Sequence, residues 1–396
     1  MSTIRTFKPL ALAALLALGT APAAWAQADE AMLARFKSFV AEQGVAIDWK
    51  GVNSYENEEG DEVTSLTDVT ISGDGETVPV PQLDLAGVEE TDDGWRIGKL
   101  SVPSMTVTED DSEAWLYDIN VEDLFLPAAD ATEEDGAIPS YSSASMREMQ
   151  VRVKGKDVFS MSDLHIEVTQ DEDGGPMEFS GAAESFHVAL DGIEDAQTRA
   201  MAASLGYEAL DGYLEMEGSW NPADGQLSLA RYDISIENAG TFGISFELGG
   251  YTPELFAAIR KVQAQTNEAG GDDSAAGMAM LGLMQQMTFK SARIEFTDDS
   301  LTSRALEFVA QQQGAKASDV ANQAKALVPF ALMQINNPEL TQMATQAVSA
   351  FLDDPQNFAI VAQPPAPVPF AMIAAGAMGA PQALPQQLGV KVVANE

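Results

Sequence analysis

The sequence predicts an α+β protein in which a large twisted antiparallel β-sheet packs against C-terminal helices. Three observations support this fold class. Apolar and polar residues alternate with a period of two through much of residues 27–250, as they do in half-buried strands. From residue 251 onward, apolar residues recur at helical spacing. Acidic residues crowd the first of these regions and become sparse in the second.

The uneven charge divides the chain into two regions. Asp48–Asp135 holds 25 acidic and three basic residues, whereas Leu301–Glu396 holds six acidic and four basic residues. Such an asymmetry indicates structurally distinct parts. We therefore expect an acidic, β-rich region with an N-terminal helix over residues 27–250. A near-neutral, mostly helical region over residues 251–396 is expected to pack on the sheet.

The first 26 residues are typical of a secretory signal peptide. Arg5 and Lys8 give a basic start, and Leu10–Leu18 is an unbroken apolar run. Ala24 and Ala26 then place small residues before the predicted cleavage site. The apolar run is far shorter than the ~20 residues that span a bilayer. We expect cleavage after Ala26, export to the periplasm of a Gram-negative-type cell, and no transmembrane segment in the mature chain. An uncleaved anchor is the alternative.

The acidity limits the possible partners. The net charge of the chain is −40, and removal of residues 1–26, which hold two basic residues and no acidic one, makes it −42. Such a field repels phosphate polyanions, so nucleic acid is excluded as a partner. It also repels an anionic membrane surface. Solvation of the folded chain explains the acidity more simply than a dedicated basic partner does.

The N-terminal part reads as one helix followed by strands. Ala28–Gln43 has apolar residues at helical spacing, and Val63–Ser72 alternates as a strand does, with Asp74-Gly75 as a hairpin turn after it. Pro79 and Pro81 interrupt the next alternating run, which indicates an edge or irregular strand because proline lacks the N–H that a central strand needs.

Pro103 is predicted to separate two short strands, Trp95–Leu100 and Met105–Thr108, and Glu133–Ser145 reads as a surface loop. The clearest local pattern is Tyr213–Leu248, in which alternating runs flank an Asn-Pro-Ala-Asp-Gly turn, and it predicts a three-stranded meander. A helix is predicted at Glu194–Leu210. Further strands are predicted at Met149–Lys154, Leu164–Thr169, Met177–Ser180 and Phe186–Leu190.

A weak internal echo has the form Asp, apolar, polar, apolar. Similar strands, each entered through an aspartate that tolerates turn geometry, explain it. A row of such carboxylates could in principle bind cations, and the structural interpretation is favoured. The four aspartates are Asp68, Asp118, Asp163 and Asp233.

The C-terminal region is predicted to be mostly helical. The Met-rich helix Ala275–Met287 is favoured as core over an adaptable ligand surface. Phe370–Met378 is a short apolar segment, and within Phe370–Ala380 a buried connector is favoured over a segment that dips into a membrane or a partner. The other predicted elements are the helices Pro253–Gln265, Leu301–Gln313, Ser318–Gln334 and Pro338–Leu352 and the strands Phe289–Phe296, Asn357–Gln363 and Leu388–Val393.

Most catalytic signatures are absent from the sequence. Cysteine is missing, which excludes disulfides, thiolate metal sites and cysteine nucleophiles. His165 and His187 lie in alternating runs and are expected to face a sheet surface. No HExxH, GxSxG or phosphate-binding glycine motif occurs, and the acidic run at Asp171 lacks calcium-loop spacing. We therefore assign no catalytic, cofactor-binding or metal-binding residue, while paired carboxylates stay possible among 61 acidic residues.

Three segments resemble a family of uncharacterised exported periplasmic proteins that is defined as a domain of unknown function. They are Trp220–Gly225 with Tyr232–Asn238, then Arg293–Arg304, then Phe351–Pro355 with Pro364–Pro367. The resemblance covers roughly Tyr213 onward and brings no catalytic residues. The β-rich region also looks remotely similar to AsmA-like envelope proteins, whose long sheets handle lipids, although the membrane anchor of those proteins is missing here.

Together these observations favour a non-catalytic periplasmic envelope protein that binds a partner protein or an apolar ligand between sheet and helices. The alternative is a carboxylate-dependent hydrolase in the periplasm, which would need two acids roughly 5–9.5 Å apart in a cleft.

Overall fold

The structure is a computed structural model that describes residues 27–396, except for residues 43, 59, 74–75, 130–139, 171–174, 193–194, 256, 260–261, 263–278 and 334–335. The chain divides into two compact units, Met1–Glu167 (unit 1) and Val168–Glu396 (unit 2). The division falls inside a strand, whereas the charge pattern places a boundary near residue 250. The predicted signal peptide, the Asp74-Gly75 turn and the acidic run at Asp171 lie outside the described residues.

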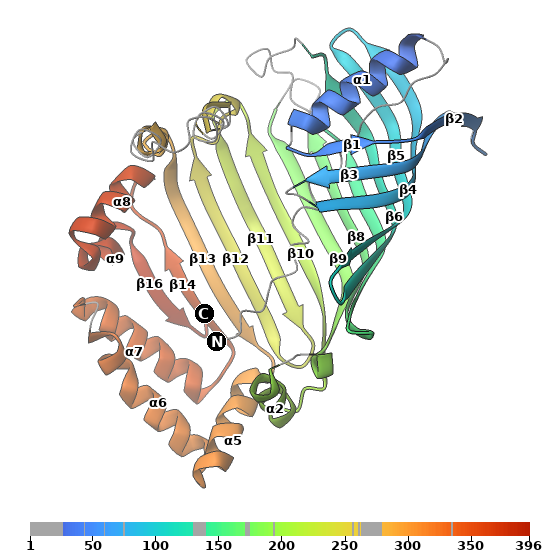
Figure 1. The fold of residues 1–396 in the computed structure, drawn as a ribbon. Helices are drawn as coiled ribbons and strands as arrows, with labels where there is room; N and C mark the ends of the chain where they lie inside the picture. The colour runs from blue at the N-terminus through green and yellow to red at the C-terminus, as the bar shows by residue number, and fades with distance from the viewer. Residues whose placement is uncertain are drawn as a thin grey trace. The chain divides into compact units, whose positions relative to one another are not determined.

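The described strands form a 16-stranded antiparallel sheet in which most strands neighbour the next in the chain (Figure 1). The predicted α+β class is confirmed, with the sheet dominant and most helices in the C-terminal half. The elements of unit 1 are α1 (Gln27–Glu42), β1 (Ala46–Asp48), β2 (Gly51–Glu56), β3 (Glu62–Gly73), β4 (Glu76–Thr91), β5 (Gly94–Glu109), β6 (Ser112–Pro127), β7 (Ser143–Val153) and β8 (Lys156–Gln170), of which the last crosses into unit 2.

Unit 2 continues with strands and then with helices. Its strands are β9 (Met177–Ala189), β10 (Ala209–Asn221), β11 (Gln226–Ile236), β12 (Gly240–Gly249), β13 (Thr288–Asp298), β14 (Asn357–Ala362), β15 (Val368–Pro369) and β16 (Val390–Ala394). Its helices are η3 (Leu190–Gly192), α2 (Ala196–Ser204), α5 (Leu301–Gln313), α6 (Ala317–Ala331), α7 (Pro338–Asp353), α8 (Phe370–Gly379), η5 (Pro381–Ala383) and α9 (Leu384–Gln387).

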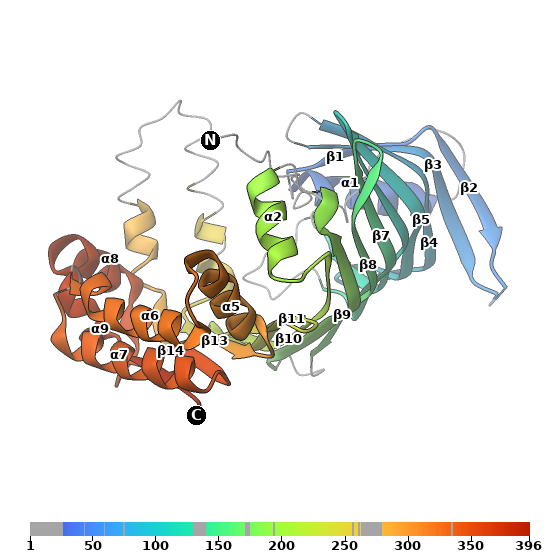
Figure 2. The same cartoon turned by 90° about the horizontal axis from the view of Figure 1, so that it is seen from below.

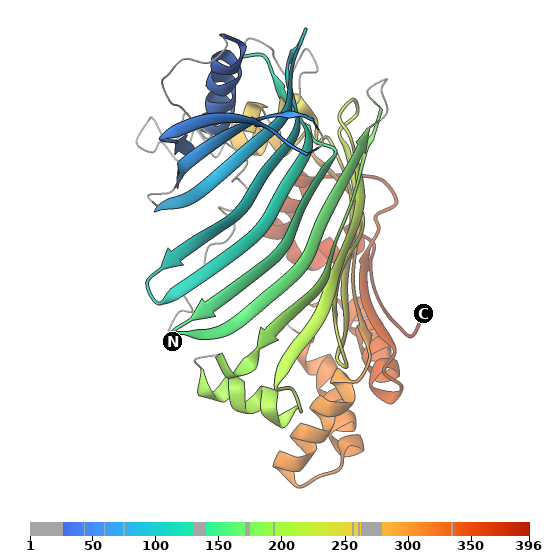
Figure 3. The ribbon, with the colours of Figure 1, turned by 90° about the vertical axis from the view of Figure 1, so that its right-hand side faces the viewer.

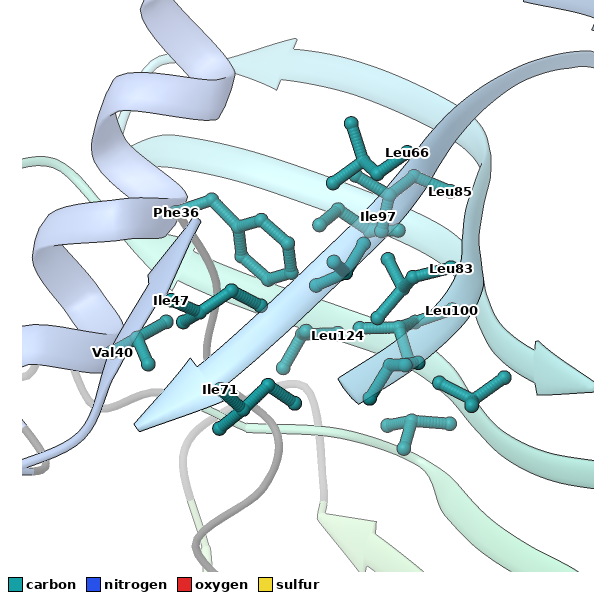
Figure 4. Close-up of a cluster of buried hydrophobic side chains, with 14 of the residues drawn as sticks. Phe36, Val40, Ile47, Leu66, Ile71, Leu83, Leu85, Ile97, Leu100 and Leu124 are labelled. Atoms are coloured by element: carbon teal, nitrogen blue, oxygen red, sulfur yellow. The ribbon is translucent and has the colours of Figure 1, made fainter. Parts of the chain in front are cut away.

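Unit 1 buries its core between α1 and the sheet. Met32, Phe36 and Val40 recur every four residues, so they lie on one face of α1, and all three are fully buried. Figure 4 shows Phe36 and Val40 pointing toward the apolar side chains of the strands. Each such side chain contributes about 1.5–3 kcal/mol when it is buried. In unit 1 the covering helix is thus the N-terminal one, whereas the sequence analysis assigned that role to the C-terminal helices.

Several strands are longer than the sequence predicts. The strand β5 runs through Pro103 without a break, and β9 joins the two predicted strands Met177–Ser180 and Phe186–Leu190. The register explains the first case, because Pro103 faces Asp118, which has a left-handed backbone. Pro103, which has no N–H to donate, therefore lies opposite Asp118, whose backbone departs from the regular hydrogen-bonding pattern of the strands. The helix α2 is shorter than predicted, since β10 already begins at Ala209.

Pro79 and Pro81 lie within β4, which lies between β3 and β5 in the sheet and is therefore not the predicted edge strand. The register of β4 with β5 covers Asp84–Thr91 and stops short of both prolines. Pro79 pairs with Thr70 of β3 on the other side. The missing N–H groups thus fall where β4 pairs with one neighbour.

Three of the four echoed aspartates share an unusual backbone. Asp68, Asp118 and Asp163 have φ of 51°, 51° and 50°, and they lie inside β3, β6 and β8 rather than at strand entries. A left-handed φ costs most L-residues roughly 1–2 kcal/mol, and Asp tolerates it better than most. Asp233, inside β11, does not share this conformation.

These left-handed residues align across neighbouring strands. Asp118 and Asp163 both face Arg147 of β7, as the pairs on either side of each residue show. Gly87 and Asp123, with φ of 62° and 53°, both face Gly98 of β5. The irregular positions therefore form lines across the sheet of unit 1, and the recurring Asp is their sequence signature.

In unit 2 the predicted meander is confirmed as β10, β11 and β12, and β13 extends it. The helices α5, α6 and α7 pack on one another in sequence, and α7 also packs along β16 (Figure 2). Phe351 at the end of α7 lies 5.8 Å from Phe358 and 6.5 Å from Phe296, measured between ring centroids. Within the described part of the chain, no helix is both long and apolar enough to cross a membrane.

The apolar segment near the C-terminus differs from its prediction. Phe370–Gly379 forms the helix α8, and none of its residues is buried. A helix that is apolar on all sides is typically part of a core, but Met372 and Met378 of α8 are exposed in the described part of the chain. The described part of the Met-rich helix is likewise only partly buried, and Leu281 is exposed.

Candidate functional site

The two faces of the unit 2 sheet differ in chemistry. Because paired residues of antiparallel strands point to the same side, the register assigns each side chain to a face. One face is apolar along three successive rows, which we call the apolar face. The central row consists of Gly181, Met216, Tyr232, Ile244, Ile294, Ile360 and Val392.

The rows on either side of it have the same character. They are Ala183, Leu214, Ile234, Phe242, Phe296, Phe358 and Ala394, and then Phe179, Gly218, Leu229, Phe246, Ala292, Ala362 and Val390. Within these three rows, the Tyr232 hydroxyl is the one polar side-chain atom. The apolar face therefore offers contact area and almost no hydrogen bonding.

The middle of the apolar face is open. Phe242, Ile294 and Ile360 on three adjacent strands are 41%, 46% and 45% exposed. Ile294 pairs directly with Ile360, and Phe242 lies one row away. Isolated exposed apolar side chains need no explanation, but a group of large ones makes this region a candidate site.

One end of the apolar face is closed by α2 and α5, which lie side by side in all three views (Figures 1, 2 and 3). Tyr207 packs with Leu190 and Ala239 against apolar residues of β9, β10 and β11. Arg304 of α5 stacks on the Tyr207 ring at 4.9 Å and donates a hydrogen bond to the Leu205 carbonyl at 3.2 Å. This end is therefore fixed by specific polar contacts.

A hydrogen bond likewise connects two segments at the other end of the sheet. The Trp220 indole N–H donates a 2.6 Å hydrogen bond to the Tyr251 carbonyl. Leu255, shortly after it, is buried. The exposed centre of the apolar face thus lies between two ends at which specific side-chain contacts hold neighbouring segments together.

Aromatic side chains lie close to two glycines on this face. A Cβ placed on Gly218 would come within 2.4 Å of Cζ of Phe179, and a Cβ on Gly212 within 2.6 Å of Cζ of Phe186. Each ring therefore occupies the space that a larger neighbour would need. Phe179 and Phe186 thus add apolar area beside positions that carry no side chain.

The opposite face of unit 2 is polar and carries a row of acids. Glu215 pairs with Asp233, which pairs with Gly243, which pairs with Glu295. Arg231 donates to Glu215 at 3.2 Å, and Arg293 donates to Glu295 at 2.7 Å. Both outer carboxylates are thus neutralised by an arginine.

Asp233 is the chemically distinctive member of that row. Its pKa is raised above the ordinary value, chiefly because partial burial penalises the charged form, with repulsion from Glu215 and Glu295 added and attraction to Arg231 opposing it. A Cβ on Gly243 would lie 2.7 Å from the Oδ1 atom of Asp233, so this carboxylate leans over the glycine. The row provides a carboxylate with a raised pKa on an open sheet surface.

The other residues singled out by sequence stay apart. Lys50 lies 3.6 Å from Asp68, and Arg147 pairs with Asp118, so two echoed aspartates have cationic partners from the chain itself. Across the part of the chain that the structure describes, no group of three potential metal ligands comes together. His165 and His187 are exposed on the sheet surface as predicted, and His187 lies 2.7 Å from Asp211.

Two grooves lie among the C-terminal helices. One, of about 540 Å³, runs between α6 and α7 and is lined by apolar and amide side chains such as Leu332, Met333 and Asn337. The other, of about 220 Å³, lies between α7 and β16 and includes Glu339 and Lys391. Glu339 is the one acid that lines either groove, so neither holds the carboxylate pair that a hydrolase requires.

The apolar face was not identified as a candidate site in the sequence analysis. The signal was present in β12, where Phe242, Ile244, Phe246 and Leu248 alternate with small or polar residues. Alternation shows which side chains share a face, but whether another element covers that face depends on tertiary packing.

Comparison with known proteins adds one finding. A family model described as "Uncharacterized protein" matches residues 233–395, from β11 almost to the C-terminus. No curated protein matches the chain. The match supports a domain of unknown function in the region where the sequence resemblance was expected, and this region contains the open centre of the apolar face.

Proposed function

We propose that this protein is exported to the periplasm and holds a ligand with acyl chains on the apolar face of unit 2, without catalysing a reaction. The observation that carries the proposal is the open centre formed by Phe242, Ile294 and Ile360. Burial of this surface by a ligand would be favourable by about 25 cal/mol per Å² of apolar area. The export step rests on the N-terminal signal pattern.

Acyl chains suit this surface better than a compact polar molecule does. The three rows provide one side-chain hydroxyl, on Tyr232, so directional recognition is weak. The rings of Phe186 and Phe179 lie close to Gly212 and Gly218 and extend the apolar area along which flexible chains can lie. A partner protein would bring its own polar groups, which would lose water without finding hydrogen bonds there.

The test is the ligand content of the mature chain purified without detergent. Organic extraction and mass spectrometry are expected to find acyl-chain compounds with the wild type. Ile294→Asp places a charge in the open centre and should reduce the retained ligand by about tenfold or more. The matched control is Tyr213→Asp, because Tyr213 is 44% exposed on the opposite face, where it pairs with Ser235.

Two results would contradict the proposal. One is a wild-type extract without apolar compounds, and the other is an equal loss of ligand in the Tyr213→Asp control. Circular dichroism of each variant establishes that the sheet is still folded.

A carboxylate-dependent hydrolase is the second candidate, favoured by the raised pKa of Asp233, since a general acid needs a carboxyl that holds its proton. Asp233→Asn separates the two functions. Ligand retention should be unchanged in this variant if the apolar face is the functional site, whereas a hydrolase would lose turnover.

A further inference from the structure

One end of unit 2 carries a surface without charge. No charged residue occurs between Asp354 and Lys391, and none occurs in residues 279–289. The two segments meet in the fold, because β15 pairs with the start of β13 and the Phe370 amide donates to the Met287 carbonyl at 3.0 Å. Figures 1 and 2 both show α8 beside the helical turn that precedes β13.

The exposed side chains at this end protrude from short helices. Met372 is 55% and Met378 is 81% exposed, and both lie on the outer side of α8 with Ala375. The inner side is held by α9, since a Cβ on Gly376 would lie 2.7 Å from Leu384. Leu281 of the neighbouring turn is 45% exposed. We call Leu281, Met372, Ala375 and Met378 the apolar tip.

We propose that the apolar tip docks this protein on a lipid bilayer with zwitterionic headgroups. Apolar side chains of a helix that lies in the interface enter the boundary between headgroups and acyl chains, and they need no partner groups there. The rest of the chain carries a net charge of −40, so anionic lipids would repel it. A neutral headgroup surface avoids that repulsion.

A second copy of the chain fits the tip less well. Two copies would bring two large negative charges together. A stable protein interface also buries about 800 Å² on each partner, usually with some 20–30 residues. The apolar tip is a few protruding side chains, and such a shape suits insertion into a fluid surface better than docking on a second protein. This inference goes beyond the proposed ligand function and does not depend on it.

The test is flotation of the mature chain with phosphatidylcholine vesicles. The wild type should float with them, and admixture of phosphatidylglycerol should reduce the bound fraction at low salt, with recovery as salt screens the repulsion. Met372→Asp with Met378→Asp should lower the bound fraction by about tenfold or more, because a carboxylate in the apolar boundary is costly.

The matched control substitutes Leu327→Asp and Met333→Asp, which are 57% and 64% exposed but lie in α6 and shortly after its end. Its flotation should equal that of the wild type. As a second readout, the emission of Met378→Trp should shift to the blue on vesicles and be quenched by brominated lipids.

Three results would overturn the proposal. They are a wild type that stays free of phosphatidylcholine vesicles, a control variant that loses binding as much as the tip variant does, and a concentration-dependent dimer that the tip variant abolishes. Because ligand extraction is measured without vesicles, failure of the docking proposal leaves the ligand proposal separately testable.

Discussion

The apolar side of the sheet is buried in unit 1 and partly exposed in unit 2. In unit 1 the row Leu85, Leu100 and Val121 crosses β4, β5 and β6, and all three side chains are buried. In unit 2 the row that contains Ile294 and Ile360 crosses the sheet in the same way, yet both are nearly half exposed. The same alternating pattern thus gives a closed core in one unit and an open surface in the other.

The helices account for the difference. The helix α1 lies across the sheet of unit 1 and places Phe36 over its middle. In unit 2 the helices α2 and α5 close one end, and α7 runs along the edge strand β16. A sheet face that is closed at its ends and open at its centre leaves apolar area in water, and the burial of that area does not stabilise the fold.

The largest effect that would sharpen this comparison is expected in the core of unit 1. Leu100→Ala should lower the free energy of unfolding by about 2–5 kcal/mol, because it leaves a cavity among fully buried neighbours. Ile294→Ala in unit 2 should cost less than about 1 kcal/mol, since water already reaches that side chain.

Urea unfolding followed by circular dichroism measures this difference, because the strands of both units contribute to the signal. Equal destabilisation by the two alanine substitutions would mean that the apolar faces of both units are buried to the same degree, which would contradict the difference between the two units.

A smaller effect is expected where rings lie over glycines in unit 2. Gly218→Ala should destabilise the protein by about 1–3 kcal/mol, because the new methyl group would meet Phe179 and the Ser228 carbonyl at 2.4–2.5 Å. Gly282→Ala is the control, since nothing lies within 4 Å of a Cβ there. Thermal unfolding by circular dichroism reports both, and a neutral Gly218→Ala would show that the face is more loosely packed.

The smallest effect concerns the polar face of unit 2. The raised pKa of Asp233 means that the folded chain holds this proton more tightly than the unfolded chain does. The free energy of unfolding therefore falls as the pH rises from the ordinary pKa of 3.8 through the raised value. Asp233→Asn removes this loss, so the variant should be slightly more stable at neutral pH, within about 0.5 kcal/mol.

The gap between wild type and Asp233→Asn should close below pH 3.8, where the carboxyl is protonated in both states. Urea midpoints across the acid range measure it. A wild type that is the more stable of the two at neutral pH would show that Asp233 is stabilised by a charge rather than penalised by burial.

The sequence predicts local structure well where the chemistry is local. The Asn221–Gly225 turn marks the meander, and the helix Leu301–Gln313 has the predicted bounds, with Gly314 in the left-handed conformation at its end. Pro103 misled the prediction, because its tolerance inside β5 depends on Asp118 of another strand. A single strand cannot reveal the backbone of its neighbour.

The candidate sites depend on packing that the sequence does not contain. Alternation in β12 gives the composition of the apolar face but does not show that its centre is uncovered. The helix α8 is apolar all round, a pattern typical of burial, yet Met378 is its most exposed large side chain. The recurring aspartate pattern is visible in the sequence. The left-handed backbone of Asp68, Asp118 and Asp163, which accounts for three of its four members, is seen only in the structure.

The aligned left-handed positions in unit 1 constrain how this chain can vary. A side chain at Asp118 or Asp163 can change while the strands keep their neighbours, but one added residue in β6 or β8 would move the irregular position away from Arg147. The same shift would turn every following side chain to the other face. Insertions should therefore be confined to the hairpin loops, and the strand lengths of this unit should be more constant than their sequences.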